Sequence, residues 1–381
     1  MTTHRILIGS ILKPTNDARM YEKIGKSLAL LPNTEIHIAG YKSAVESVPN
    51  QFFYPIFSSS RLSFKRFLAP WKFAKIALKV KPDTIIVSTH ELLIVTYLYK
   101  ILFGGIIIYD VQENYRNNIL YTGVYPPLIK HILAYYVRIK EKVCSKKIDG
   151  FLLAEKTYET ELSGFIKSPC LILENKYKGC PNSKREIVRI HEGGKIRMLY
   201  SGTIAASYGV FEAVDLAIRL YLLDYRFELT IIGYAPSCRD LNHLTSRITP
   251  YPFIQLIGGS KPVPHAEILS AIESHQVGLL PYRQNESTAE RVPTKLFEYL
   301  LNKLPVISSQ NPIWEKYIHD FQAGFSIPFN KLPTAKELKE KIIEQDFYTQ
   351  GNPQELIWEE SKLLDWYKVN FFEALPEEKE G

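Results

Sequence analysis

The sequence predicts an α/β protein with two domains, each built on a doubly wound parallel sheet. The chain has 381 residues, whereas a single hydrophobic core usually stops growing near about 250 residues. From Arg5 onward, short apolar runs alternate with amphipathic stretches of helix length, which is the pattern of a parallel sheet wrapped by helices. A polar, turn-rich stretch, 174–195, interrupts this alternation, which then starts again and predicts a second domain.

Five apolar runs in the first half predict strands at 6–9, 35–39, 84–88, 106–109 and 151–154. Amphipathic stretches predict helices between them, including 20–31 and 127–147. The stretch 91–110 has about the length of a membrane span. Lys100 at its centre and the pair Gly104-Gly105 favour instead a buried helix, a tight turn and a buried strand.

The second half predicts strands at 198–201, 228–232, 277–280, 305–308 and 325–327. A last helical pattern, 353–374, follows Gly351-Asn352-Pro353 and is long enough to pack against either domain, including back on the first. We therefore expect a first domain over 1–178, a linker over 179–195, a second domain over 196–350, and a C-terminal helix with an acidic tail over 351–381.

The charge of the chain is unevenly distributed. Residues 1–180 carry a net charge of +11 and residues 181–381 one of −4, which together give the +7 of the whole chain. Basic residues lie among Phe, Leu and Trp at Arg61, Lys65, Arg66, Lys72, Lys75, Lys79 and Lys81, and again over 130–147. This mixture suits the anionic surface of a membrane, but ordinary surface helices have it too. No recognised nucleic-acid motif accompanies the charge, so no nucleic-acid partner is expected.

Composition also restricts the class of protein and its compartment. An apolar content of 46% is ample for two cores and excludes a disordered chain. The four cysteines, Cys144, Cys170, Cys180 and Cys238, form no C-x-x-C pair, which indicates a reducing compartment. The N-terminal residues lack the features of a signal peptide. We expect a cytoplasmic protein, either free or peripheral on the inner face of the membrane.

Several common ligand motifs are absent. The first predicted strand is not followed by G-x-G-x-x-G, which disfavours a nicotinamide cofactor. Gly25-Lys26-Ser27 imitates the end of a phosphate-binding loop, but it lies inside a helical pattern without the loop's first glycine. His90-Glu91 lacks the second His of a zinc helix, and there is no Asp-x-Asp pair. No cofactor and no metal are expected.

The segment 287–299, STAERVPTKLFEY, is the strongest candidate site. It follows the predicted strand 277–280, at the edge of a parallel sheet where such folds bind ligands. Pro293 suits the first turn of a helix, and the amides of Thr294, Lys295 and Leu296 would then lack intrahelical acceptors. Free amides, the helix dipole and the Lys295 charge together predict an anion site.

Two carboxylates flank this predicted anion site. Glu290 precedes the helix and Glu298 lies within it. A carboxylate can accept two hydrogen bonds from a vicinal diol, which both a sugar ring and a ribose offer. The two glutamates are therefore consistent with a site for a nucleotide sugar, in which one carboxylate binds the sugar and the other binds the ribose.

The segment resembles the Glu-x7-Glu motif of retaining family 4 glycosyltransferases, which have the GT-B fold of two Rossmann-like domains facing a central cleft. PTKLFEYLLNKLPVISS is similar to the corresponding motif of many members. The stretch 199–217 resembles the first strand, glycine loop and helix of their donor domain, and 17–29 and 109–115 resemble acceptor-domain segments. The likeness covers nearly the whole chain.

This resemblance implies a role for each matching residue. Glu290 would contact the donor sugar and Glu298 the ribose, while the amides of 294–296 would bind the diphosphate. The diphosphate would depart with retention of anomeric configuration and without a metal, its charge stabilised by fixed donors.

The sequence departs from the family pattern in three places. Many members carry an Arg after the loop glycine and a Lys before the next one, where Thr203 follows Gly202 and Tyr208 precedes Gly209 here. Lys295, Arg283 or Arg291 could replace those cations. Gln112 stands where a His is common, and His90, after the strand 84–88, is the nearest candidate to replace it as a catalytic contact.

Three functions are consistent with these residues. The leading hypothesis is a glycosyltransferase that moves a hexose or N-acetylhexosamine from a nucleotide-diphosphate sugar to a glycan or lipid-linked acceptor. The missing cations motivate a second, a catalytically silent subunit that binds a nucleotide or a partner transferase. The third is a nucleotide-sugar epimerase of related architecture.

Overall fold

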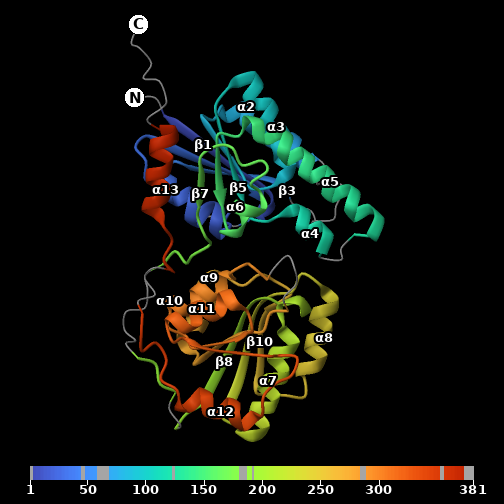
Figure 1. Ribbon diagram of the computed structural model, residues 1–381, viewed down its shortest axis with the longest axis vertical. Helices are drawn as coiled ribbons and strands as arrows, with labels where there is room; N and C mark the ends of the chain where they lie inside the picture. Colours follow the sequence, from blue (N-terminus) through green and yellow to red (C-terminus); the bar gives the residue numbers. More distant parts are fainter. Residues whose placement is uncertain are drawn as a thin grey trace. The chain divides into compact units, whose positions relative to one another are not determined.

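The computed structural model of the chain describes residues 3–43, 48–57, 68–121, 125–179, 187–190, 193–283, 289–351 and 356–372. The chain divides into two compact units. The first comprises Met1–Lys178 together with Trp358–Gly381, and the second comprises Gly179–Ile357. Each unit consists of a parallel sheet covered by helices (Figure 1).

The first unit contains a seven-stranded sheet in the order β3-β2-β1-β4-β5-β6-β7, with every neighbouring pair parallel. The strands are β1 (His4–Pro14), β2 (Thr34–Tyr41), β3 (Gln51–Phe57), β4 (Thr84–Val87), β5 (Ile106–Val111), β6 (Gly150–Leu153) and β7 (Cys170–Ile172). The strand order reverses between β1 and β4. Such a reversal is where open α/β sheets place their ligands, outside the carboxyl ends of the strands.

The helices of the first unit are the π-helix η1 (Ala18–Gly25), α1 (Lys26–Leu28), α2 (Ala69–Val80), η3 (His90–Leu92), α3 (Leu93–Phe103), α4 (Tyr115–Tyr121), α5 (Pro127–Cys144), η4 (Ser145–Lys147), α6 (Thr157–Glu161), α13 (Glu360–Tyr367) and the π-helix η7 (Lys368–Phe372). α3 contacts both α2 and α5.

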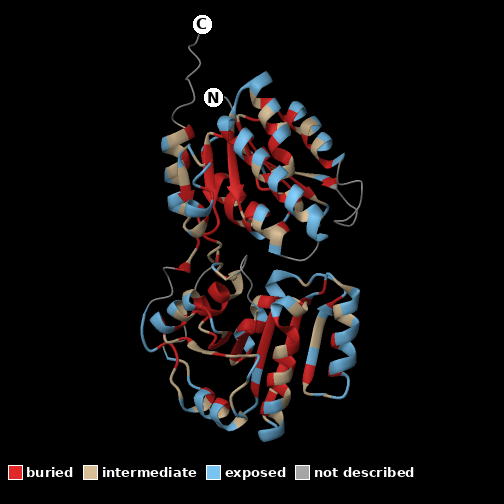
Figure 2. Cartoon of the chain, turned by 45° about the vertical axis from the view of Figure 1, so that its right-hand side comes forward, coloured by how far each residue is buried: buried red, intermediate tan, exposed pale blue. Residues whose placement is uncertain are grey.

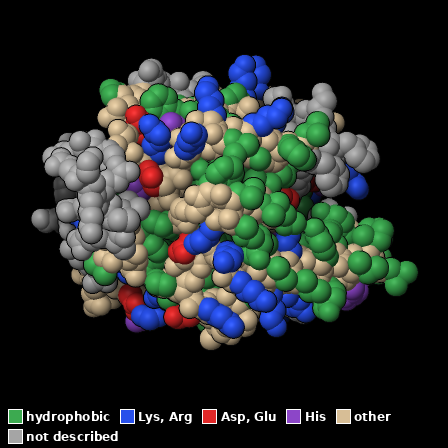
Figure 3. All heavy atoms as spheres, turned by 90° about the horizontal axis from the view of Figure 1, so that it is seen from above, with side chains coloured by type: hydrophobic (Ala, Val, Ile, Leu, Met, Phe, Trp, Pro, Cys, Tyr) green, Lys and Arg blue, Asp and Glu red, His purple; other side chains and the backbone are tan. Residues whose placement is uncertain are grey.

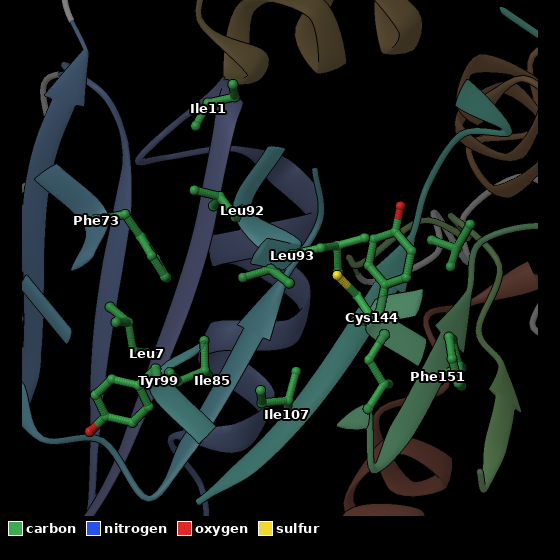
Figure 4. Packing of buried hydrophobic residues seen from close by; sticks show 14 of the residues in the cluster. Leu7, Ile11, Phe73, Ile85, Leu92, Leu93, Tyr99, Ile107, Cys144 and Phe151 are labelled. Atoms are coloured by element: carbon green, nitrogen blue, oxygen red, sulfur yellow. The ribbon is translucent and has the colours of Figure 1, made fainter. Parts of the chain in front are cut away.

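Alternate residues of the apolar strands face opposite sides of the first sheet, so the sheet has a core on each face. Leu7 belongs to one buried cluster with Phe73 of α2, Leu93 of α3 and Cys144 of α5, several members of which Figure 4 labels. Ile6, one residue before Leu7, belongs to the core on the other face. Figure 2 shows the strands as the most buried part of the unit.

The C-terminal segment covers that other face together with η1 and α1, so of the two domains left open for the last helix it packs on the first. Trp358, Leu363, Tyr367 and Phe371 are buried in the same core as Ile6. The Tyr367 hydroxyl lies 2.7 Å from the hydroxyl of Thr84 and 2.8 Å from His4 Nε2. The segment is thus fastened to β1 and β4 by hydrogen bonds as well as by packing.

The second unit contains a six-stranded parallel sheet in the order β10-β9-β8-β11-β12-β13. Its strands are β8 (Ile196–Thr203), β9 (Phe227–Tyr234), β10 (Ile254–Gly259), β11 (Val277–Leu280), β12 (Val306–Ser309) and β13 (Gly324–Ile327). Its helices are η5 (Ala206–Tyr208), α7 (Val210–Leu223), α8 (Cys238–Ile248), α9 (His265–Ser274), α10 (Thr294–Leu301), α11 (Pro312–Asp320) and α12 (Ala335–Glu344). Here the strand order reverses between β8 and β11.

Several sequence expectations can be compared with these elements. The ten predicted strands all form, and β3, β7 and β10 are additional. The stretch 91–110 folds as helix, glycine turn and strand, and within the described ranges no helix is long and apolar enough to cross a bilayer. Ser27 of the Gly-Lys-Ser triplet is buried and accepts a hydrogen bond from Trp358 Nε1 at 3.1 Å, so its role is structural. Arg61, Lys65, Arg66 and Cys180 lie outside the described residues.

Candidate functional site

The carboxyl ends of β8 and β11, on either side of the strand reversal, carry the residues of the candidate site. β8 ends in Gly202 and Thr203, and β11 is followed by Pro281, Tyr282 and Arg283. Gly202 has a φ of 126°, a conformation that residues with a Cβ rarely adopt. The chain can therefore leave the sheet at this point without a side chain in the way.

Helix α10 begins beside these strand ends. Pro293 is the N-cap of α10 and not, as expected, a residue of its first turn. Thr294 and Lys295 are the first two residues of the helix, and their amides have no intrahelical acceptors. The expectation of a third free amide is wrong, because Leu296 N–H donates to the Pro293 carbonyl at 2.9 Å. The first turn is tightened in this way, and two amides remain directed along the helix axis.

Glu298 is buried on α10 between two basic side chains. Lys295 Nζ lies 2.5 Å from its Oε2, and His265 Nε2 lies 3.2 Å from its Oε1. Burial would raise the pKa of the Glu298 carboxyl, but the charge of Lys295 and the hydrogen bond from His265 outweigh it and hold this pKa at about 2. Glu298 is thus an ionised acceptor fixed in place.

Lys295 links this carboxylate to the end of β8. A Cβ built on Gly202 would lie 3.7 Å from Lys295 Cε and 4.0 Å from the Tyr282 hydroxyl oxygen. Gly202 therefore lies in contact distance of the Lys295 side chain, and the structure brings these predicted residues together. The ammonium group supplies positive charge next to a glycine loop, where one of the expected cations is missing.

Two buried tyrosines connect the end of β8 to α10 and to the segment that follows β8. The Tyr299 hydroxyl lies 2.9 Å from Ser201 Oγ and accepts the Ser201 amide at 3.2 Å. The Tyr200 hydroxyl donates to the carbonyls of Thr203 and Tyr208, at 2.7 and 3.2 Å. α10 and the segment after β8 are consequently both tied to β8.

The segment after β8 packs closely on the end of β11. Gly209 has a φ of 75°, and a Cβ built on it would lie 1.8 Å from the Pro281 carbonyl oxygen. Only glycine fits this position. The partly exposed ring of Tyr208 meets the ring of Tyr282 edge to face, at 5.1 Å between centroids. Thr203 and Tyr208 thus line the site without a positive charge.

Arg283 has a carboxylate partner of its own. Its Nε donates to Glu212 Oε1 at 2.5 Å, and Glu212 lies in the first turn of α7. Both residues line a cavity of about 470 Å³ at the carboxyl ends of β11, β12 and β13, together with 281–282, 309–310 and 327–330. The guanidinium is therefore placed to contact a ligand in this cavity while its charge is balanced.

A larger cavity of about 720 Å³ lies at the opposite edge of the same sheet. It is lined by 187–190, Gly194, Lys195, His275 and Gln276, beside the amino ends of β8 and β11. Open α/β sheets bind ligands at the carboxyl ends of their strands. We therefore take the smaller cavity and the start of α10 as the candidate functional site.

Glu290 is exposed, and the backbone on both sides of it is anchored. Asn311 Nδ2 donates to the Ala289 carbonyl at 2.6 Å, and Trp314 Nε1 donates to the Arg291 carbonyl at 2.7 Å. Trp314 is itself buried. Residues 284–288, including Ser287 and Thr288 of the motif, lie outside the described residues. The carboxylate of Glu290 is thus presented to solvent from a fixed turn.

His90 belongs to the first unit, at the carboxyl end of β4 and next to the strand reversal of that sheet. Its Nδ1 lies 2.6 Å from Nζ of the buried Lys140, and its ring meets the ring of Tyr115 edge to face. An ammonium group can only donate, so Nδ1 accepts and the remaining proton of a neutral ring lies on Nε2. Lys140 thereby sets the tautomer of His90.

Gln112, in the place of the family histidine, is part of a buried network. Its Nε2 donates to Asp110 Oδ2 at 2.7 Å. Asp110 also pairs with the buried Arg19, whose guanidinium donates to the Leu173 carbonyl as well. Through Asp110, Gln112 is therefore connected to Arg19, so the segments 17–29 and 109–115, which resemble acceptor-domain motifs, are joined.

Sequence reasoning missed three residues of this site, His265, Tyr282 and Trp314, and gave no role to Tyr299. All four act through contacts with residues far away in the chain, which no local motif signals. Across the residues that the structure describes, no group of three or more His, Cys, Asp or Glu side chains is arranged to hold a metal ion.

Comparison with known proteins gives a fold-level match. No protein-family model matches the sequence, and no curated protein is found as a relative. Among solved structures, sucrose-phosphate synthase from Thermosynechococcus elongatus is 12% identical with a TM-score of 0.62, covering 97% of this chain and 95% of that one. HepE from Anabaena, in complex with UDP and glucose, is 10% identical with a TM-score of 0.64, covering 97% and 99%. An α,α-trehalose 6-phosphate synthase from Burkholderia multivorans is 10% identical with a TM-score of 0.57, covering 97% and 95%.

The two sheets with their strand orders, together with these matches over nearly the full length, define the class. The chain has the GT-B fold of two Rossmann-like domains, as the sequence predicted. At identities of 10–12%, these structural matches show the architecture alone, and the reaction has to be argued from the residues of the site.

Proposed function

We propose that the chain is a retaining glycosyltransferase that moves a hexose or N-acetylhexosamine from a nucleotide-diphosphate sugar to a glycan or lipid-linked glycan acceptor, without a metal ion. In this proposal Glu290 contacts the donor sugar, Glu298 the ribose, and Lys295 with the amides of Thr294 and Lys295 the diphosphate.

One observation carries the proposal: the buried, ionised Glu298 lies between Lys295 and His265, and Lys295 reaches Gly202 at the strand reversal. A carboxylate has about four acceptor positions, and two of these are used by Lys295 and His265. The other two suit the vicinal hydroxyls of a ribose. The same lysine supplies the positive charge that a diphosphate needs close by.

The proposed reaction exchanges one bond at the anomeric carbon for another. The bond between the anomeric carbon and a diphosphate oxygen breaks, a bond to the acceptor hydroxyl oxygen forms, and the acceptor proton passes to the departing diphosphate. Negative charge grows on the diphosphate as it leaves, and fixed donors lower the barrier when they are aimed at that charge. The opening amides of α10 and the Lys295 ammonium group serve as those donors.

Proteins of the same fold suggest which donor to test first. HepE was crystallised with UDP and glucose, and two other matches are named as synthases of sucrose phosphate and trehalose 6-phosphate. A UDP-hexose is therefore the first donor to assay, with GDP-, ADP- and dTDP-sugars beside it.

The test has a binding step and a transfer step. A nucleoside diphosphate at 100 times its Kd should stabilise the folded protein by about 2.7 kcal/mol, which thermal unfolding with each diphosphate will measure. Transfer should be lost in Glu290→Gln and kept in Glu340→Gln, a control on exposed α12 surface. Failure of every nucleoside diphosphate to bind would refute the proposal.

A catalytically silent subunit is the second candidate. Thr203 and Tyr208 stand where cations are expected, and Arg283 is already balanced by Glu212. Binding of a nucleoside diphosphate without transfer to any acceptor, together with stimulation of a second transferase, would favour this candidate.

A further inference from the structure

Helices α3 and α5 of the first unit expose large apolar side chains instead of polar ones. On α5, Leu128 is 84% exposed and Ile132 is 72% exposed. The other exposed apolar residues of the two helices are Ile94, Leu98, Ile101, Leu102, Phe103, Ile129, Tyr135, Tyr136, Ile139 and Val143. Figure 3 shows hydrophobic side chains gathered on this face of the molecule with Lys and Arg side chains beside them.

The exposed residues of α5 form a second apolar stripe. Ala134, Val137 and Cys144 face the interior of the unit, as one stripe of a surface helix should. Leu128, Ile132, Tyr135 and Ile139 recur at the same helical spacing but face outward. Scattered apolar residues on a surface are ordinary, whereas a continuous stripe on neighbouring helices marks a docking surface.

The exposed charged side chains on the segments that form this surface all have one sign. Seven lysines are exposed on α2 and its C-cap, on the last turn of α5 and on η4: Lys72, Lys75, Lys79, Lys81, Lys142, Lys146 and Lys147. The segments 68–81, 93–103 and 127–147 contain a single acidic residue, Glu141, and it is buried. The surface therefore offers apolar area and positive charge without exposed negative charge on these segments.

We infer that this surface, formed by α2, α3 and α5, binds the anionic face of a lipid bilayer. Leucine, isoleucine and phenylalanine side chains enter the boundary between headgroups and acyl chains, tyrosines suit the same depth, and lysines reach anionic headgroups. Each lysine near such a surface contributes about 1 kcal/mol of attraction. A second copy of the chain is a poorer occupant, since its equivalent surface would bring seven further exposed lysines against these.

The inference goes beyond the proposed reaction and is independent of it. The membrane-binding surface belongs to the first unit, whereas Lys295 and Glu298 belong to the second. Each of the two proposals can therefore fail without the other. Binding to vesicles without binding of any nucleotide would refute only the proposed reaction. Binding of a nucleotide without binding to vesicles would refute only the membrane inference.

Co-sedimentation of the full chain with vesicles tests the inference. Vesicles of phosphatidylcholine with about 30% phosphatidylglycerol should bind the protein at least tenfold more tightly than pure phosphatidylcholine, because lysine attraction requires anionic lipid. Raising the salt from about 0.05 to 0.5 M should weaken binding, because it screens the charges. Equal partition into both vesicles, or no binding to either, would overturn the inference.

Matched variants distinguish binding through this surface from binding through any exposed apolar or basic side chain. Leu128→Ser/Tyr135→Ser should lower vesicle binding at least tenfold, whereas Leu222→Ser/Tyr225→Ser, on side chains that are 79% and 80% exposed in the second unit, should leave it unchanged. Lys72→Gln/Lys75→Gln/Lys79→Gln should weaken binding, and Lys261→Gln/Lys331→Gln/Lys336→Gln, with the same loss of charge, should not. Thermal unfolding verifies that each variant is folded.

Self-association is the competing outcome, and sedimentation velocity detects it. The inference predicts a monomer without lipid. A dimer that Leu128→Ser/Tyr135→Ser dissociates, together with absence of vesicle binding, would assign the surface to a second copy of the chain and overturn the membrane inference.

Discussion

Lys295 Nζ lies 2.5 Å from the Glu298 carboxylate, so the cation proposed for the diphosphate and the anion proposed for the ribose are joined before any donor binds. The pair is mostly buried, and His265 completes it. Because a carboxylate has further acceptor positions, the pair can persist while Glu298 receives ribose hydroxyls. Donor binding is then expected to find a site that is already organised.

Replacing Lys295 by Gln should weaken binding of the nucleoside diphosphate at least tenfold, because a charge-assisted contact is lost. Removal of one such donor also typically lowers kcat by about 10² to 10³. Calorimetric titration and initial rates measure both effects. Lys316→Gln, on exposed surface of α11, is the control and should change neither; an unchanged Kd in Lys295→Gln would refute the role of this lysine.

The depressed pKa of Glu298 predicts a specific dependence of stability on pH. The folded state holds the pKa at about 2 against an ordinary value of 4.5, so the unfolded chain binds a proton first as the pH falls. The resulting stabilisation of the folded state amounts to about 3 kcal/mol. It is fully present above pH 4.5 and is lost as the pH falls towards 2. Denaturant unfolding of Glu298→Gln should therefore approach the wild type at low pH, and a constant difference would contradict the assignment.

Trp314 is expected to support catalysis without contacting substrate, because its indole N–H holds the carbonyl beside Glu290. Trp314→Phe keeps most of the packing and removes the donor. We expect kcat to fall while the KM for the donor changes little, since the donor contacts of α10 remain. Phe297→Leu, a packing change of similar burial in the same unit, should reduce stability without this separation of kcat from KM.

Glu141 should oppose folding at neutral pH. Burial raises its pKa to about 7, and Arg138 Nη1 at 3.7 Å and the Tyr109 hydroxyl at 3.1 Å do not compensate. Between pH 4.5 and 7 the unfolded chain has lost the proton that the folded state keeps, so stability falls as the pH rises through this range. Glu141→Gln should be more stable than the wild type at pH 8 and similar at pH 4. Parallel pH profiles of the two proteins would refute this.

Local patterns predicted most of the architecture. β1, β4, β5 and β11 each contain an uninterrupted apolar run, and such runs indicate buried parallel strands by themselves. β7 has three residues at the edge of its sheet, and β3 and β10 are also edge strands, where less burial leaves a weaker pattern. The strands that sequence reasoning missed are therefore those least constrained by the core.

The site was predictable only where its residues are neighbours in the chain. Glu290, Lys295 and Glu298 lie within one segment, so their order with Pro293 indicated an anion site. His265 reaches Glu298 from 33 positions away, and Ser201 meets Tyr299 across 98. The hydrogen bond from Leu296 to Pro293 depends on how tightly the first turn winds, which residue type does not specify.

The position of the C-terminal segment in the chain affects how the protein folds during its synthesis on the ribosome. The core around Ile6 is closed by Trp358, Leu363, Tyr367 and Phe371, which are synthesised after the whole second unit. A nascent chain must therefore carry a sheet face that only η1 and α1 cover while the later unit emerges and folds. The first unit is begun before the second but is completed after it. During translation, this apolar face is therefore the region most in need of a chaperone.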